Sequence, residues 1–262
     1  MKRMGRRASR CCSFMASAGA RASFSTATTQ GALAEAGYRV YSIDLLGFGR
    51  SSRPAIRYTQ DLHVAQIEAF ITSLGEPVTV VANGLSAAYS IRLAAERPDL
   101  VRRLVLISPT GYKRLDRPAN EARISDFARF TGFLGTLLYG VLLDEGSQRF
   151  FLLDAYVNES SLTPEVLASY DRNLKVENAQ WVIFSFISGN LDQPVGAYWP
   201  GLEQPTLILW GEEAQTTPPS DAQAFLEARP EAGLVLIDGA KLLPNEDRPE
   251  RFNREVLDFL AR

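Results

Sequence analysis

The chain has 262 residues, of which 46% are hydrophobic and 22% charged, and its formal net charge is −2. This length suits one α/β domain with an insertion. The balanced charge gives no reason to expect nucleic acid as a partner, since that usually needs a clustered basic face. The longest apolar runs, such as Gly132 to Leu143, are too short to cross a bilayer. Cys11 and Cys12 are the only cysteines and His63 is the only histidine. A disulfide framework and a multi-histidine metal site are therefore excluded, and we expect no cofactor.

The first thirty residues differ in composition from the rest of the chain. They hold six basic residues and no acidic one, interleaved with Ala, Ser and Thr, and the first carboxylate is Glu35. Arg-rich, Ser-rich and acid-free segments are typical of organelle transit peptides. We therefore predict that residues 1–30 form a disordered basic tail that directs the chain to an organelle, a chloroplast rather than a mitochondrion. A cytoplasmic protein with a basic tail is the alternative.

From Gly31 onward, short apolar strands alternate with helices. Residues 77–82 (PVTVVA) form an apolar run with one threonine, which is typical of a strand buried on both faces of a sheet. The alternation predicts an α/β fold, a mostly parallel sheet with flanking helices. Strands are expected at residues 38–44, 77–82, 101–108, 206–210 and 234–238, and helices at residues 61–74, 85–96, 220–229 and 249–262.

Residues 112–200 interrupt this alternation with a helical, aromatic-rich segment. Thr163 followed by Pro164 predicts a helix start, because a hydroxyl caps the first turn and proline suits its first position. We predict an inserted helical cap between two core segments, residues 31–111 and 201–262. Cap aromatics could contact an apolar small molecule, although packing inside the cap would explain each of them as well. The candidates are Phe130, Phe133, Trp181 and Phe184.

Four short motifs stand where strands end. Residues 44–51 read D-L-L-G-F-G-R-S, and residues 82–86 read A-N-G-L-S between a strand and a helix. Residues 211–214 read G-E-E-A, and residues 239–244 read G-A-K-L-L-P. In their order and spacing, these motifs resemble those of the α/β-hydrolase superfamily, and in particular its capped chloroplast- and cyanobacteria-type members. The resemblance covers residues 31–262.

The resemblance implies positions for a serine nucleophile, an acid and a histidine base, in that chain order. These positions hold Gly84, Ala214 and Leu242, and none of the three can act in nucleophilic or acid–base catalysis. We therefore predict that serine-hydrolase catalysis has been lost. The protein would then bind an apolar small molecule or a partner protein. The sequence gives no indication of the oligomeric state.

The resemblance also implies a central strand ending in His-Gly before residue 31, and no such motif occurs between Met1 and Gln30. The fold is accordingly predicted to be N-terminally truncated. The missing strand would lie between the strands at residues 38–44 and 77–82, where its loss would leave buried backbone groups unpaired. A truncated, non-functional gene product is therefore one alternative.

A rewired hydrolase of small esters is another alternative. In it, Lys241 would activate Ser86 as in Ser-Lys enzymes, and Glu212 or Glu213 would replace the acid. His63 lies in the helix before the central strand, far from the histidine loop in sequence. We predict that it is a surface or interface residue.

Overall fold

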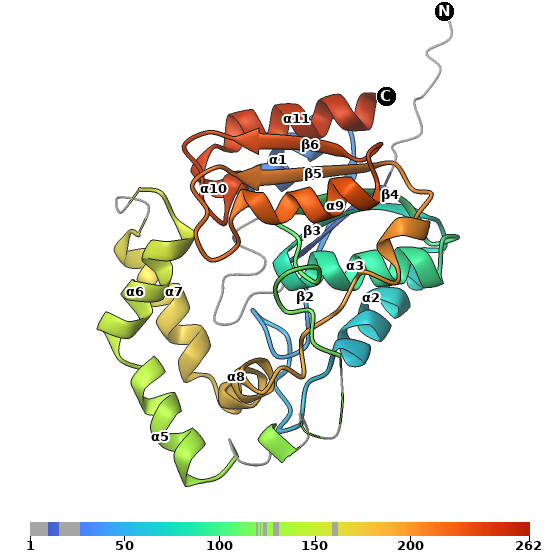
Figure 1. Cartoon of the computed structure of the whole chain (residues 1–262). Coiled ribbons are helices and arrows are strands. Elements are labelled where there is room, and N and C mark those ends of the chain that lie inside the picture. The colour runs from blue at the N-terminus through green and yellow to red at the C-terminus, as the bar shows by residue number, and fades with distance from the viewer. Residues whose placement is uncertain are drawn as a thin grey trace, which may run out of the picture.

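The computed structural model describes residues 10–15, 27–118, 120, 122, 125–127, 131–158 and 162–262. In these residues the core is a six-stranded sheet in the order β2-β1-β3-β4-β5-β6, with every neighbouring pair parallel (Figure 1). The strands are β1 (Arg10–Met15), β2 (Arg39–Asp44), β3 (Val78–Asn83), β4 (Val101–Ile107), β5 (Thr206–Gly211) and β6 (Gly233–Ile237). The predicted fold class is confirmed, and five predicted strands occur within two residues of their expected bounds.

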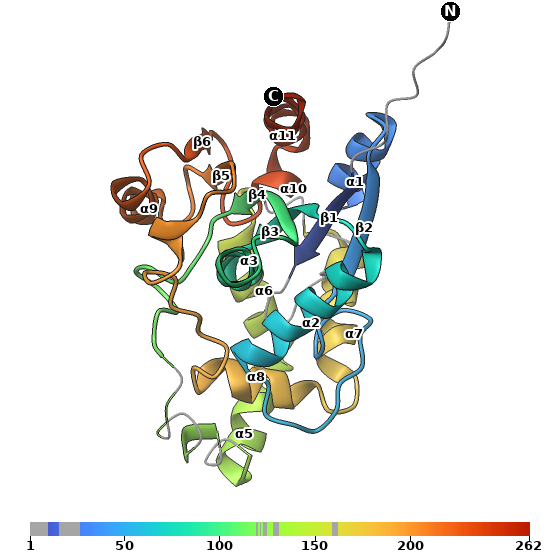
Figure 2. The same cartoon turned by 90° about the vertical axis from the view of Figure 1, so that its right-hand side faces the viewer.

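Helices cover both faces of the sheet (Figure 2). Alternate residues of β3 and β4 point to opposite faces: Val80 and Leu104 belong to one apolar cluster, Val81 and Val105 to the other. Because both faces are covered, β3 is buried along its whole length. One face carries α2 (Gln60–Leu74), α3 (Gly84–Glu96) and α9 (Ala222–Ala228), and the other carries α1 (Ala27–Glu35) and α11 (Pro249–Ala261).

The predicted absence of the central strand is wrong. β1 lies between β2 and β3, and its residues pair in parallel with both, Cys12 standing opposite Tyr41 on one side and Val80 on the other. The prediction of disorder for residues 1–30 is therefore also wrong for residues 10–15, and for residues 27–30, which begin α1. A strand is needed here for a physical reason. Without β1, the backbone N–H and C=O groups along one edge of β2 and one edge of β3 would have no hydrogen-bond partners inside the sheet.

Between β4 and β5, the described residues include four α-helices of at least nine residues each, which lie beyond the carboxyl ends of the strands (Figure 1). The Thr163 hydroxyl accepts the Val166 N–H at 3.3 Å and Pro164 is the first residue of its helix, so the predicted helix start is confirmed. The four helices are α5 (Phe133–Leu142), α6 (Glu145–Ala155), α7 (Pro164–Lys175) and α8 (Ala179–Ile187). We call them the cap. The remaining short helices are η2 (Trp199–Gly201), η3 (Pro219–Asp221) and α10 (Pro244–Asp247).

Buried hydrogen bonds attach the cap to the core next to α8. The Tyr58 N–H donates to the Ser185 hydroxyl at 2.9 Å, and the Tyr89 hydroxyl donates to the Leu191 carbonyl at 2.7 Å. Tyr58 and Tyr89 are both fully buried. A buried donor left without its acceptor is costly, so these bonds fix this edge of the cap to α3 and to the segment that precedes α2.

Candidate functional site

The glycine-rich loop after β2 folds around the Asp44 carboxylate. Asp44 Oδ2 accepts the Arg50 N–H at 2.9 Å, and the Ser51 hydroxyl donates to the Asp44 carbonyl at 2.6 Å. A Cβ at Gly49, whose φ is +51°, would come within 2.3 Å of the Asp44 carboxyl carbon. Glycine is therefore required at position 49, because backbone and carboxylate are in direct contact there. In this chain the motif of residues 44–51 has a structural role.

The turn between β3 and α3 is tight and centred on Gly84, which has a φ of +54°. Asn83 ends the strand, and Gly84 is the first residue of the helix. Among the described residues, a Cβ built on Gly84 would meet no heavy atom within 4 Å outside its own turn and helix backbone. Position 84 therefore combines a left-handed backbone, which costs a non-glycine residue about 1–3 kcal/mol, with open space for a side chain.

Ser86 closes this turn from inside. Its hydroxyl donates to the Asn83 carbonyl at 2.8 Å and accepts the Asn83 N–H at 3.2 Å, and the side chain is fully buried. These bonds satisfy backbone groups where the chain changes from strand to helix. Ser86 therefore stabilises the turn from a position that solvent does not reach.

The turn after β5 contains Ala214. The residue is 5% exposed, and its N–H donates to the Gly211 carbonyl at 3.3 Å. Gly211 itself is needed for a close approach, because a Cβ there would lie 2.0 Å from the Lys241 carbonyl oxygen. Glu212 and Glu213 are both exposed to solvent. The carboxylates next to Ala214 are thus not buried at this edge of the sheet.

The loop after β6 contacts both other turns. The Glu213 N–H donates to the Ala240 carbonyl at 3.0 Å, and Asn83 Nδ2 donates to the Leu242 carbonyl at 3.3 Å. Leu242 is half-buried and packs against an apolar cluster that includes Leu152 of α6. The turns that hold Gly84, Ala214 and Leu242 therefore meet at the carboxyl edge of the sheet, although residues 84 and 242 lie far apart in the sequence.

Lys241 points to the cap. Its Nζ donates to the Leu153 carbonyl at 2.8 Å, and its N–H donates to the Asp247 carboxylate at 2.9 Å. Asp247 also accepts the Val157 N–H at 3.2 Å, and burial raises the pKa of its carboxyl group. Lys241 and Asp247 therefore join this loop to the cap.

Comparison with known proteins agrees with this arrangement of strands, turns and cap. Residues 16–255 match the sequence model of the Alpha/beta hydrolase family. The chain belongs to this family.

Individual hydrolases resemble the chain, two of them along most of its length and a lipase over about a third of it. A 2-hydroxy-6-oxo-6-(2'-aminophenyl)hexa-2,4-dienoic acid hydrolase of Metapseudomonas resinovorans is 26% identical over 228 residues, which is 86% of this chain and 74% of that protein. A (Lyso)-N-acylphosphatidylethanolamine lipase of Homo sapiens is 35% identical over only 94 residues, 32% of this chain and 26% of that protein. A meta-cleavage product hydrolase from Pseudomonas fluorescens IP01 has the same fold, with a TM-score of 0.78, 22% identity, and coverage of 97% of this chain and 90% of that chain.

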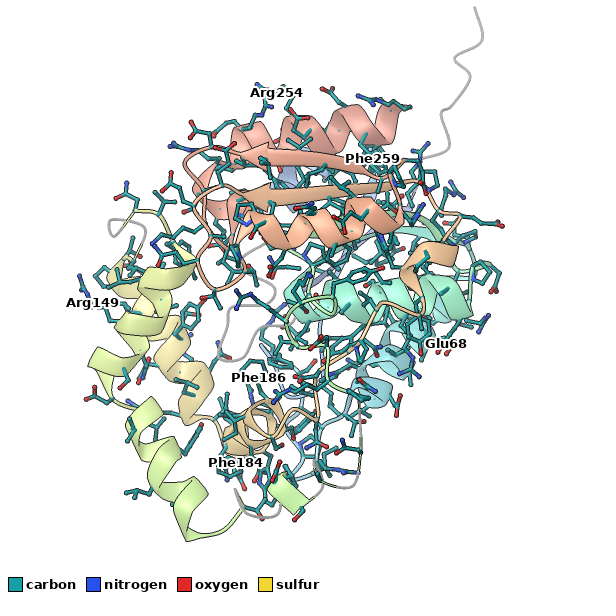
Figure 3. All side chains as sticks on the ribbon, in the orientation of Figure 1. Glu68, Arg149, Phe184, Phe186, Arg254 and Phe259 are labelled. Atoms are coloured by element: carbon teal, nitrogen blue, oxygen red, sulfur yellow. The ribbon has the colours of Figure 1, made fainter. Side chains whose placement is uncertain are left out.

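The aromatic candidates of the cap take part in packing where the structure describes them. Phe184 is buried, with its ring 6.2 Å from that of Tyr139, and the half-buried Trp181 lies 5.9 Å from Phe127. Figure 3 shows Phe184 and Phe186 on α8. The backbone of Phe133 begins α5. Phe130 lies outside the described residues, and a ligand-binding role for the four candidates stays a prediction.

The prediction that His63 is a surface or interface residue is wrong. The ring is fully buried, and its Nε2 lies 3.0 Å from the Leu46 carbonyl, so Nε2 carries the proton. The rings of Phe48, Tyr58 and Tyr89 surround it at centroid distances of 5.8, 6.2 and 5.4 Å. Burial lowers the pKa of His63 to about 4, against the opposing effect of the Leu46 hydrogen bond. His63 is thus a neutral core residue that holds the loop after β2.

This buried ring predicts a loss of stability in mild acid. Between pH 7 and pH 5.5 the unfolded chain protonates His63, whose ordinary pKa is 6.5, whereas the folded chain does not. Stability therefore decreases as the pH falls, by about 1 kcal/mol over this interval. Urea unfolding at both pH values measures the change in wild-type protein and in His63→Phe. The variant should lose this part of the pH dependence, and an equal dependence in both proteins would contradict the assignment.

Among the described residues, no group of three or more His, Cys, Asp or Glu side chains could bind a metal ion. In the same part of the chain, no helix is both long and apolar enough to cross a membrane.

Proposed function

We propose that this α/β-hydrolase has lost serine-hydrolase catalysis and binds a small organic molecule with an apolar part between the Gly84 turn and the cap. The observation that carries the proposal is the Gly84 turn. It has the left-handed backbone and the open space that a nucleophile at this place needs, and the residue there has no side chain. Once catalysis is no longer selected, glycine at such a position removes the backbone strain of a serine.

The two other positions support the same proposal. Ala214 and Leu242 stand in turns that contact each other, the turn of Leu242 also contacts the Gly84 turn, and both residues have apolar side chains. The only histidine of the chain is buried and contacts the loop after β2. The imidazole of a nucleophile–imidazole–carboxylate chain is therefore missing from this edge, and positions 84, 214 and 242 supply none of its three members.

The geometry argues against a rewired hydrolase built on Ser86 and Lys241. The Ser86 hydroxyl is buried and bonded to the Asn83 backbone, whereas the Lys241 ammonium is bonded to a cap carbonyl. A serine nucleophile needs an exposed hydroxyl and a base within hydrogen-bond distance. Ser86 as placed meets neither requirement.

The proposed ligand class follows from the open position and from the relatives. The side-chain space above Gly84 suits an organic group, and one relative is named for an aromatic-substituted dienoic acid. A binding protein of this fold could retain the ligand pocket without the reaction, because fold and activity are separable.

The test combines binding and turnover with 2-hydroxy-6-oxo-6-phenylhexa-2,4-dienoate as the probe. Calorimetry should detect binding to the wild-type chain, while absorbance of the probe stays constant over hours. Gly84→Phe should abolish binding by filling the open space. Gly75→Phe is the matched control, because Gly75 has a φ of +72° and equally open surroundings at the end of α2. Turnover that Ser86→Ala abolishes would contradict the proposal.

A further inference from the structure

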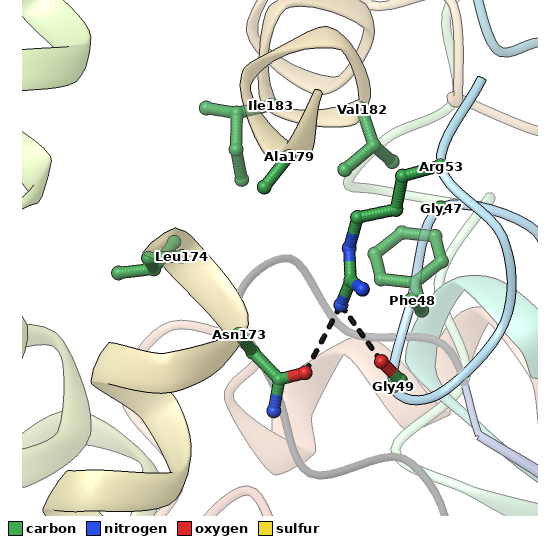
Figure 4. Close-up of a pocket in the computed structure, with 9 residues that line it drawn as sticks. All are labelled: Gly47, Phe48, Gly49, Arg53, Asn173, Leu174, Ala179, Val182 and Ile183. Atoms are coloured by element: carbon green, nitrogen blue, oxygen red, sulfur yellow. Dashed lines mark hydrogen bonds between the residues drawn. The ribbon is translucent and has the colours of Figure 1, made fainter. Parts of the chain in front are cut away.

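The crevice between the glycine-rich loop and the cap is narrow, and Arg53 bridges it (Figure 4). Its Nη2 donates to the Gly49 carbonyl at 2.8 Å and to Asn173 Oδ1 at 3.0 Å, so the side chain links the loop to α7. The crevice has a volume of about 10 Å³. A groove at the opposite end of the sheet is much larger, with a volume of about 270 Å³.

This groove lies where α2 ends and where β3 and β4 begin, on the side of the sheet away from the cap. Its floor is apolar, because Ile71 and Leu100 line it and both are buried. Its rim is exposed or half-buried. The residues of the rim are Thr72, Gly75, Glu76, Pro77, Arg97 and Asp99. The groove therefore combines an apolar floor with a charged, accessible rim.

The rim carries more negative than positive charge. The Arg97 guanidinium donates to the two carboxylate oxygens of Asp99 at 3.0 and 2.8 Å, and it also donates to Glu68. Glu76 adds a third carboxylate to this single guanidinium. Each carboxylate oxygen can accept more than one hydrogen bond. The groove is therefore suited to a further cation on an aliphatic stem, which would place its charge on the rim and its stem on the floor.

Residues 1–9, which precede β1 and lie outside the described residues, have the complementary composition. They hold four basic residues, two methionines and no acidic residue. The basic residues are Lys2, Arg3, Arg6 and Arg7. Long basic side chains and methionine together match a groove with carboxylates on its rim and an apolar floor.

The register of β1 attaches this segment next to the groove. Cys11 stands opposite Thr79 in the parallel ladder, so Arg10 starts its strand beside Val78, directly after the groove residue Pro77. Neighbouring strands lie about 4.8 Å apart, and nine extended residues reach up to about 30 Å. The groove is therefore within easy reach of the basic residues that precede Arg10.

We propose that residues 1–9 dock in this groove of their own chain, with Arg6 and Arg7 on the carboxylates of Glu76 and Asp99. The docked segment secures the start of β1, a strand without β-branched residues, between its two neighbours. The groove lies at the end of the sheet opposite the Gly84 turn, so the proposal does not depend on whether catalysis has been lost.

Carbodiimide cross-linking of the full chain tests the contact, because the reagent joins an amine to a carboxylate only where the two touch. Arg7→Lys keeps the charge and supplies the amine. Mass spectrometry should then find a link within one chain from position 7 to Glu76 or Asp99. Arg39→Lys is the matched control, since Arg39 is exposed at the start of β2, on the other side of β1. The amine at position 39 should form no link to either carboxylate.

Charge reversal tests the effect on stability. Arg6→Glu/Arg7→Glu should lower Tm by roughly 2–6 °C, because attraction to the rim becomes repulsion. Adding Glu76→Lys should restore part of the loss. Adding Glu212→Lys is the control, because it makes the same charge change at an exposed carboxylate at the opposite end of the sheet, and it should restore nothing.

The cross-link still decides the question if the charge-reversed variant fails to fold. The proposal is overturned if position 7 forms no link to the groove, or if Glu76→Lys and Glu212→Lys change Tm equally. A link that forms only between two chains would assign the groove to a second copy and would overturn the proposal as well.

Discussion

The triple variant Gly84→Ser/Ala214→Asp/Leu242→His is expected to hydrolyse p-nitrophenyl esters about 10²- to 10⁴-fold faster than the wild-type chain. The turns that carry these positions are already in contact, through Asn83 Nδ2 on the Leu242 carbonyl and Glu213 N–H on the Ala240 carbonyl. A serine at position 84 would enter open space above the sheet. Leu85 follows at the start of α3, where backbone N–H groups have no intrahelical acceptor and can stabilise an oxyanion.

The variant Gly84→Ala/Ala214→Asp/Leu242→His is the matched control, because it has the same backbone strain and the same acid and base but no hydroxyl. It should remain at the wild-type rate. Each single substitution should also be inactive, since triad members act as a unit. A folded triple variant, with a wild-type circular dichroism spectrum and no gain over the alanine control, would show that the three turns do not form a triad geometry.

The second large effect is expected at β1. Ser13→Pro should destabilise the protein by about 3 kcal/mol or more, because proline removes a ladder N–H and does not fit a central strand. Ser13 pairs with Ser42 on one side and Val81 on the other, so its backbone lies inside the sheet. Urea unfolding followed by circular dichroism measures the loss.

Ser13→Ala is the control for this prediction, since it keeps the backbone N–H. It should unfold at nearly the wild-type urea concentration. Deletion of residues 1–26 should abolish cooperative unfolding altogether, because it removes the whole strand between β2 and β3. If Ser13→Pro and Ser13→Ala unfold at the same urea concentration, β1 is not part of the stable sheet.

The parallel sheet was predictable because its strands have strong signals. Residues 78–82 are apolar apart from Thr79, and buried parallel strands are usually rich in Val, Ile and Leu. β1 (RCCSFM) lacks β-branched residues and lies in a basic, serine-rich segment, so its local pattern resembles a targeting sequence. The family resemblance required a strand between residues 38–44 and 77–82, but without the expected His-Gly motif nothing in residues 1–30 marked where that strand lies.

The sequence predicted where the candidate site lies, but it did not predict the hydrogen bonds that the side chains make there. The motifs placed Gly84, Ala214 and Leu242 in turns, and the structure brings these turns together. The hydrogen bonds of Ser86 and Lys241 could not be predicted, because they depend on the backbone of the turn and on α6. His63 did have a signal: with Ile67 and Ile71 it forms an i, i+4, i+8 series, which is the buried face of α2.

The central claim, that the chain lacks a serine nucleophile, is tested most directly by intact-mass spectrometry after treatment with a fluorophosphonate probe. The reagent forms a stable adduct with an activated serine. The wild-type protein is expected to show no adduct, and the triple variant is expected to show one adduct, at the serine introduced at position 84. A single stoichiometric adduct on the wild-type chain, absent from Ser86→Ala, would contradict the account and assign catalysis to Ser86.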